Sequence, residues 1–171
     1  MNKYPIDLKP VNPLLGELTD TQCPFKIIPR HSPTVFEQLN TTFRLSDYRG
    51  YRKVNYINYR KSETFATLPQ YDQMYFVVHG FLSSGAAHIG MRKPLLTNSV
   101  FKRPAAVFVD WSFGADPFTL FGQLDCLLDL QCRYDLPTIN TGVVGRELGV
   151  LIYQLVQAGV VLPENIHLIG N

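Results

Sequence analysis

Three short apolar runs in this sequence end in residues that could bind or orient a substrate. The runs and the motifs that follow them are Met74–Val78 with His79-Gly80-Phe81, Ala105–Val109 with Asp110-Trp111, and Ile166–Ile169 with Gly170-Asn171. A glycine after a buried strand permits a sharp turn and a close approach of the backbone to a ligand. Amides freed by such a turn can stabilise the oxyanion that forms during acyl transfer. Taken alone, however, a His-Gly pair is more often a structural turn.

The elements around these motifs predict a parallel sheet. Unbroken apolar runs rich in β-branched and aromatic residues are typical of strands buried on both faces. The clearest helical pattern follows Asn140, with an apolar stripe formed by Val144, Leu148, Leu151, Ile152 and Leu155. Gly159 and Pro163 are expected to end this helix. Strands that alternate with helices predict βαβ units, whose carboxyl strand ends meet at one edge of the sheet.

The rest of the chain divides into three stretches. Residues 1–40 contain six prolines and little periodicity, which predicts an irregular N-terminal segment. From residue 41 to 60, Phe43 and Leu45 alternate with polar residues, as do Val54 and Tyr56, which predicts antiparallel strands with one solvated face. Between the second and third apolar runs, residues 112–139 form an insertion that includes a weakly amphipathic stretch at 118–130. This insertion could cover the site, or it could reflect a faulty gene model.

Composition and charge argue against several classes of function. The net charge is only +2, and no run collects the 16 Lys and Arg residues, so no nucleic-acid partner is expected. Cations do alternate with tyrosines from Arg49 to Lys61, as in some single-strand binders, but a tyrosine-rich pair of strands with a solvated face is favoured. No run approaches the roughly 20 apolar residues of a transmembrane helix. Met1–Pro13 lacks the apolar stretch of a signal peptide, so either the protein is not exported by that route or the sequence begins after the true start.

Cysteine and histidine usage gives no sign of a metal or cofactor site. Cys126 and Cys132 are close enough in sequence to form a disulfide, which would leave Cys23 unpaired. The alternative, which the sequence favours equally, is that these cysteines are free buried thiols. No His, Cys or Asp cluster has the spacing of metal ligands. The sequence also contains no glycine-rich loop of the kind that holds phosphate groups, and we expect neither a metal nor a cofactor.

Four segments in this order resemble the pancreatic-lipase-like family of animals. They are Val77–Gly85, Val109–Trp111, Asn140–Gly145 and Ile166–Gly170. The family includes triglyceride lipases, phospholipases A1 and catalytically inactive yolk proteins, and the resemblance extends over residues 53–170. It implies that residues 41–171 are the N-terminal part of an incomplete α/β-hydrolase fold, in which antiparallel strands lead into parallel strands and crossover helices and end at the nucleophile elbow. It also implies an extracellular protein that acts on a lipid ester or at a lipid surface.

The resemblance assigns roles to residues near the strand ends. It implies that the backbone N–H of Phe81 is an oxyanion-hole donor and that Gly80 shapes the turn. His79 would support this loop and would not be the catalytic histidine. Asp110 would be mostly structural and would not be the acid of a catalytic triad.

The catalytic nucleophile is expected to be absent from these 171 residues. The family's third strand enters a Gly-x-Ser-x-Gly elbow; Gly170 matches its first glycine, Asn171 stands where histidine is usual, and the serine would come next. The triad acid and histidine would follow later still. None of the other candidate serines, Ser83, Ser84, Ser99 and Ser112, lies in such a frame. Of the remaining histidines, His88 is expected to face solvent on a crossover helix and His167 to lie within a strand.

These features lead to three hypotheses about function. The first is the N-terminal portion of a lipase-family carboxylic ester hydrolase in lipid breakdown, inactive as this chain. The second is a non-catalytic, yolk-protein-like member that binds lipid or a partner, and the third is a truncated splice product without a function of its own. The sequence does not separate triglyceride from phospholipid substrates.

Overall fold

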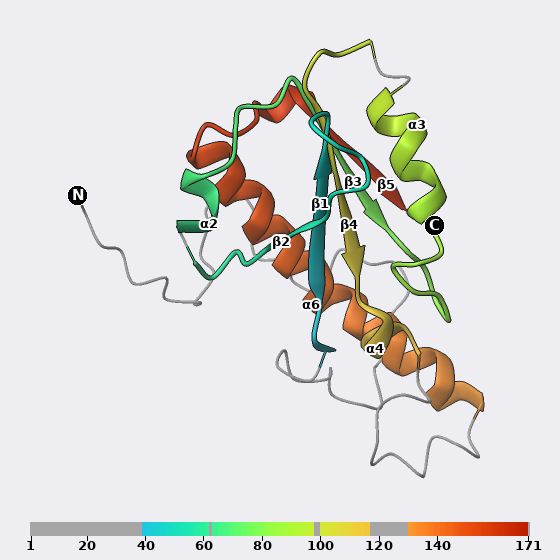
Figure 1. Ribbon diagram of the computed structural model, residues 1–171. Coiled ribbons are helices and arrows are strands. Elements are labelled where there is room, and N and C mark those ends of the chain that lie inside the picture. Colours follow the sequence, from blue (N-terminus) through green and yellow to red (C-terminus); the bar gives the residue numbers. More distant parts are fainter. Residues whose placement is uncertain (1–38, 62, 98–99, 117–129, 171) are drawn as a thin grey trace.

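The computed structural model describes residues 39–61, 63–97, 100–116 and 130–170, which form an α/β domain around a five-stranded mixed sheet (Figure 1). The strands are β1 (Thr42–Asp47), β2 (Asn55–Ile57), β3 (Gln73–Val78), β4 (Pro104–Asp110) and β5 (Ile166–Gly170). Their order in the sheet is β2-β1-β4-β3-β5. β1 is antiparallel to β2 and β4, whereas β3 is parallel to β4 and β5. The predicted change from antiparallel to parallel strands along the chain is therefore confirmed.

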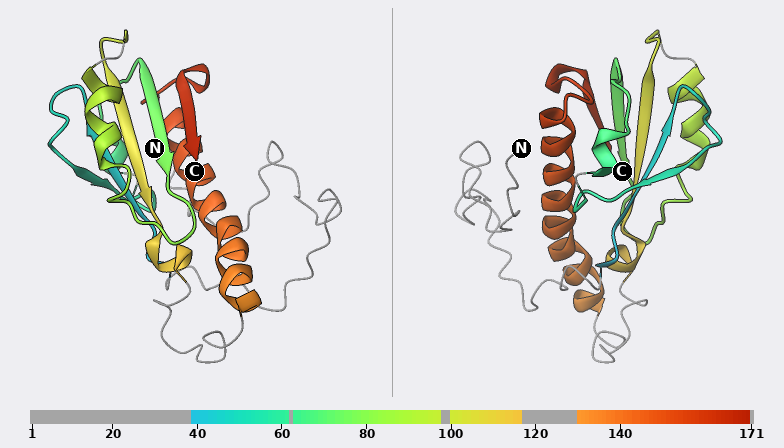
Figure 2. Two further views of the ribbon diagram at one scale, coloured as in Figure 1. Left: turned by 90° about the vertical axis from the view of Figure 1, so that its right-hand side faces the viewer. Right: turned by 60° about the vertical axis from the view of Figure 1, so that its left-hand side comes forward.

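Helices lie on both sides of the sheet (Figure 2). The long helix α6 (Leu130–Gln157) packs on one face, and α3 (Arg92–Thr97) packs on the other. The shorter helical elements are α2 (Glu63–Ala66), η2 (Ile89–Met91), α4 (Ser112–Ala115) and η3 (Pro163–Asn165). No helix in the described part of the chain is both long and apolar enough to cross a membrane.

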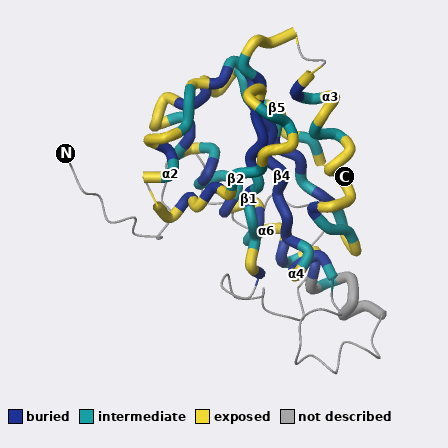
Figure 3. Tube along the Cα trace, in the orientation of Figure 1, coloured by how far each residue is buried: buried dark blue, intermediate teal, exposed yellow. Residues whose placement is uncertain are grey.

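The centre of the sheet is the best buried part of the molecule (Figure 3). All seven residues of β4 are buried, because β1 and β3 flank this strand and helices cover both faces. Successive side chains of a strand point to opposite faces. Val107 and Val109 accordingly join the cluster that includes α6, while Ala106 and Phe108 join the cluster that includes Leu96 of α3. The prediction of a strand buried on both faces is confirmed for Ala105–Val109.

The same prediction is wrong for the third apolar run. Strand β5 forms where it was expected, but its residues are half-buried or exposed, and the Leu168 residue is 63% exposed. Among the described strands, β5 has β3 as its only neighbour and stands last in the sheet. The apolar composition indicates a strand, but the position of the strand in the sheet determines how much of it is covered.

The solvated face of β2 was also predicted wrongly. Tyr56 is 65% exposed and Val54 lies outside the strand, whereas Ile57 and Tyr59 are buried. The register pairs Ile57 with Phe43 of β1. The ring of Tyr59 also meets the ring of Phe43 edge-on, with centroids 5.7 Å apart.

Helix α6 begins earlier than the sequence suggested. It was expected to start after Asn140, yet both Pro137 and Asn140 lie inside it. Asn140 is fully buried, and its Nδ2 donates to the carbonyl of Gly114 over 3.2 Å. The asparagine therefore fastens α6 to α4 and does not begin a helix. The initial ten residues of α6, together with α4, also account for part of the predicted insertion at 112–139.

The end and the apolar stripe of α6 agree with the prediction. Val144, Leu151 and Leu155 are buried against the sheet, and Leu148 and Ile152 pack partly against the same cluster. Gly159 follows the helix with φ +69, a conformation that glycine adopts without strain. Pro163 then begins η3. Residues 1–38 and the stretch 118–129 lie outside the described residues, so the predictions for them remain predictions.

Candidate functional site

The motifs at the ends of β3, β4 and β5 lie at one edge of the sheet. Val78, the last residue of β3, pairs with Val109 of β4 on one side and with Gly170 of β5 on the other. The turn His79-Gly80-Phe81 therefore leaves the sheet between the ends of two parallel strands. In open α/β sheets, ligand sites lie beyond these carboxyl ends, and this edge is the candidate site.

His79 is buried inside this edge and holds the turn. Its Nε2 accepts a hydrogen bond from the backbone N–H of Trp111 over 3.1 Å, and the Trp111 indole N–H donates to the His79 carbonyl over 2.7 Å. The Nδ1 atom lies 3.0 Å from the Gly80 carbonyl, which can only accept. The neutral ring with its proton on Nδ1 satisfies both contacts. The rings of His79 and Trp111 also stack, with centroids 5.5 Å apart.

Asp110 ties three segments together through its carboxylate. Arg44 of β1 donates to Oδ2 over 2.5 Å, and the Ser112 backbone N–H donates to Oδ1 over 3.2 Å. Contact with His79, followed by hydrogen bonds from Ser112 and the Gly85 amide, lowers the pKa of Asp110 below its ordinary value, and burial opposes this shift. The His79 Nε2 atom, 3.4 Å from Oδ1, can donate only when the ring is protonated. The pKa of Asp110 is lowered even when the His79 ring is neutral, because Ser112 and the Gly85 amide still donate to the carboxylate.

Gly85 lets the loop after β3 approach Asp110 closely. A Cβ atom at position 85 would lie 2.7 Å from the Cβ of Asp110 and 2.8 Å from its Cγ. Real Cβ contacts are never this short, and Asp110 is held by Arg44 and Ser112, so it has no room to move. The glycine is required by close packing between the loop and the end of β4.

Phe81 and Leu82 form the outer part of the turn. The Phe81 residue is 42% exposed at the edge where the resemblance expects an oxyanion donor. Leu82 has φ +53, which is unfavourable for a residue with a bulky side chain. Its N–H donates to the carbonyl of Ala115 over 3.1 Å, which docks the turn on α4. Sequence reasoning missed this strained residue, because leucine gives no signal for a left-handed conformation.

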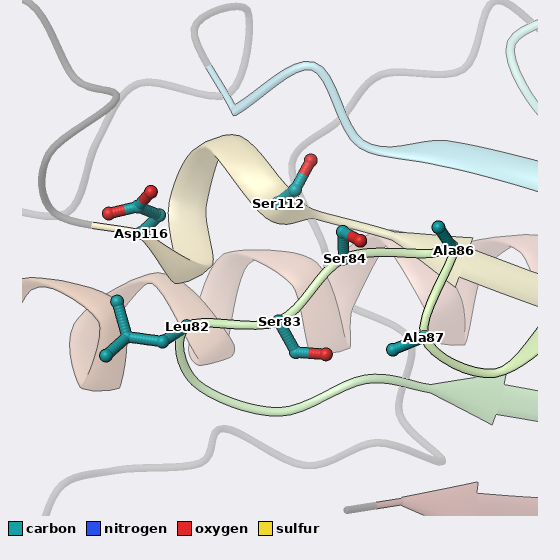
Figure 4. A pocket seen from close by; sticks show the side chains of 7 residues that line it. All are labelled: Leu82, Ser83, Ser84, Ala86, Ala87, Ser112 and Asp116. Carbon is teal, nitrogen blue, oxygen red and sulfur yellow. The ribbon is translucent and has the colours of Figure 1, made fainter.

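An open pocket of about 570 Å³ lies between this turn and α4 (Figure 4). Its walls come from two segments and consist of Leu82, Ser83, Ser84, Ala86, Ala87, Ser112 and Asp116. Three serines and one aspartate thus contribute to the lining next to the exposed end of the turn. Three of the serines named from sequence line the pocket, whereas Ser99 lies outside the described residues.

The remaining sequence candidates, His88 and His167, are not among the residues that line this pocket. His88 is only half exposed and its Nδ1 atom is buried, so the expectation that it faces solvent is wrong in part. His167 lies in β5 as expected, on the surface, with its ring 6.0 Å from that of Tyr75. Within the described part of the chain, no group of His, Cys, Asp or Glu could hold a metal ion. The proposed Cys126–Cys132 bridge is untested, because Cys23 and Cys126 lie outside that part.

Comparisons with known proteins assign no family to the chain, so its class is given by the structure alone, as an α/β domain. No family model matches the chain, and a search of curated proteins finds no match. The resemblance to lipases therefore rests on the sequence motifs alone.

Proposed function

We propose that this chain is the N-terminal portion of a lipase-type carboxylic ester hydrolase with an α/β-hydrolase fold. The observation that carries the proposal is the pairing of Val78 with both Val109 and Gly170. This pairing brings the turn after β3 next to the end of β5, where the resemblance expects a nucleophile elbow. An oxyanion hole in this fold combines the amide after the nucleophile with an amide from a loop after a neighbouring strand.

In the proposed reaction, a serine attacks the carbonyl carbon of a lipid ester, its proton passes to the histidine of the proposed triad, and the carbonyl oxygen becomes an oxyanion. The amide of Phe81 donates to this oxyanion, while His79, Trp111 and Asp110 hold the turn rigid. A rigid donor is effective because no reorganisation is needed when the charge develops. In an elbow that begins at Gly170, the serine would be the residue that follows Asn171. The resemblance also proposes an extracellular location and a lipid surface as the place of action.

The first test is hydrolysis of a short-chain nitrophenyl ester. The 171-residue polypeptide is expected to show no hydrolysis above the blank, because it contains no Gly-x-Ser-x-Gly sequence. The product of the full coding sequence is expected to hydrolyse the ester and to lose that activity when the elbow serine is replaced by alanine. A residue other than serine after Asn171 would instead favour the non-catalytic lipid-binding alternative.

A second test addresses Phe81 in the full-length protein. Phe81→Pro removes the backbone N–H and is expected to lower kcat by about 100- to 1000-fold. Phe81→Ala keeps the N–H and serves as the matched control, with a kcat within about 10-fold of the unmodified protein. Equal losses in both variants would contradict the role of the amide. Circular dichroism would establish that both variants are folded.

A further inference from the structure

Two arginines lie close together on the face of the sheet that α3 covers. Arg44 of β1 pairs across the sheet with Phe108 of β4, so both side chains lie on the same face. The guanidinium of Arg92, at the start of α3, lies over the ring of Phe108 at 5.3 Å from its centroid. Arg44 and Arg92 therefore come from two different elements, and both are neighbours of Phe108.

The two cations have too little negative charge around them. Arg44 donates to Asp110, but this single carboxylate also accepts hydrogen bonds from Ser112 and Gly85. Among the described residues, no carboxylate forms an ion pair with Arg92. Burial lowers the pKa of Arg92, and repulsion from Arg44 lowers it further. The ring of Phe108 attracts the guanidinium of Arg92 but supplies no full negative charge to neutralise it.

Buried donor atoms are also left unused at this place. The Nε atoms of Arg44 and Arg92 are both inaccessible to solvent and have no hydrogen-bond partner among the described residues. Burying a polar group without a partner is costly, and each such group in a folded protein needs an explanation such as an ion that binds there. Two guanidinium groups from different elements suit an oxyanion, because each can donate two parallel hydrogen bonds.

From these contacts we propose that Arg44 and Arg92 form a binding site for a phosphate group. Phe108 supports the guanidinium of Arg92 through a cation–π contact. Asp110 keeps Arg44 in position from the other side. A bound phosphate would compensate the like charges and accept hydrogen bonds from the terminal guanidinium nitrogens of the two arginines. The site does not depend on ester hydrolysis, because neither arginine belongs to the oxyanion turn.

Thermal unfolding of the 171-residue chain in phosphate and in chloride of equal ionic strength tests the proposal. At about 20 mM phosphate, Tm is expected to rise by about 3 °C more than in chloride, as binding to the folded state alone predicts. Arg92→Gln should lose most of this rise. In phosphate-free buffer, Arg92→Gln should be no less stable than the unmodified chain, because the variant removes the repulsion from Arg44. The control is Arg146→Gln, which replaces an exposed arginine on α6, the helix on the opposite face of the sheet from α3. This variant should keep the full rise in Tm.

The source of the phosphate group is distinguished by adding vesicles. Co-sedimentation with phosphatidic acid vesicles, lost in Arg92→Gln and reduced by inorganic phosphate, would identify a lipid headgroup as the ligand. A rise in Tm with inorganic phosphate but no co-sedimentation would identify a small phosphorylated molecule. The proposal is overturned when phosphate stabilises the chain no more than chloride does, or when Arg92→Gln keeps the full rise.

Discussion

The backbone amide of Trp111 donates a hydrogen bond to Nε2 of His79, and the Trp111 indole donates to the carbonyl of the same histidine. These two bonds connect the end of β4 with the turn after β3. Because the Nε2 lone pair is used, the histidine is not available as a general base in this arrangement. The pair thus provides rigidity for the turn, on which any function of the Phe81 amide depends.

The first prediction concerns the acceptor on His79. His79→Phe keeps an aromatic face for Trp111 but leaves its buried N–H without a partner, so the free energy of unfolding should fall by about 1–3 kcal/mol. His167→Phe at the surface of β5 is the control and should change it by less than about 0.5 kcal/mol. Urea denaturation followed by far-ultraviolet circular dichroism measures both values. Equal denaturation midpoints for the two variants would mean that the Trp111–His79 bond contributes nothing.

A second prediction follows from the space around Gly85. Gly85→Ala places a methyl group 2.7 Å from the Cβ of Asp110, and the expected loss of stability is about 1–3 kcal/mol. Gly149→Ala in α6 is the matched control, because no atom lies within 4 Å of its added Cβ. That substitution should stabilise the chain by about 0.5–1 kcal/mol, since alanine favours helix. A stabilising effect of Gly85→Ala would show that the loop does not pack against Asp110.

The parts of this molecule that could be predicted from sequence are those that local pattern determines. A strand covered on both faces must be apolar throughout, so Ala105–Val109 was found. The buried face of β2 could not be found, because Tyr56 and Ile57 are both apolar and only the pairing with Phe43 decides between them. Contacts between residues far apart in the sequence could not be predicted either. Arg44 and Asp110 are 66 positions apart, and nothing near either residue signals the ion pair.

A third prediction concerns the pH dependence of stability and Glu147. Burial raises the pKa of this carboxyl above its ordinary value of 4.5, and the hydroxyl of Tyr59, which donates to Oε1 over 3.1 Å, offsets only part of the shift. The folded chain therefore binds a proton more readily than the unfolded chain. The buried carboxylate of Glu147 therefore does not lower the free energy of unfolding below pH 4.5. It lowers this free energy increasingly as the pH rises through the folded-state pKa.

Comparison with Glu147→Gln isolates this contribution. The variant cannot ionise, so it should gain stability relative to the unmodified chain as the pH rises from 4.5 to about 7. Glu164→Gln on the surface is the control, and the difference from the unmodified chain should stay constant over that range. Urea denaturation at several pH values gives the differences. The prediction would be contradicted if the difference in free energy of unfolding between the unmodified chain and Glu147→Gln did not change with pH.

The last prediction concerns the strained backbone at Leu82. A left-handed conformation costs a non-glycine residue roughly 1–2 kcal/mol, and glycine adopts it freely. The side chain of Leu82 buries little, since the residue is 56% exposed, so Leu82→Gly should raise the free energy of unfolding by up to about 1 kcal/mol. Leu162→Gly is the matched control, because this similarly exposed leucine has φ −83. There glycine only adds freedom to the unfolded chain and should destabilise by about 0.5–1 kcal/mol. Opposite signs for the two variants would establish that the turn which carries Phe81 is held under strain by its contact with α4, whereas equal losses would show that no strain is present.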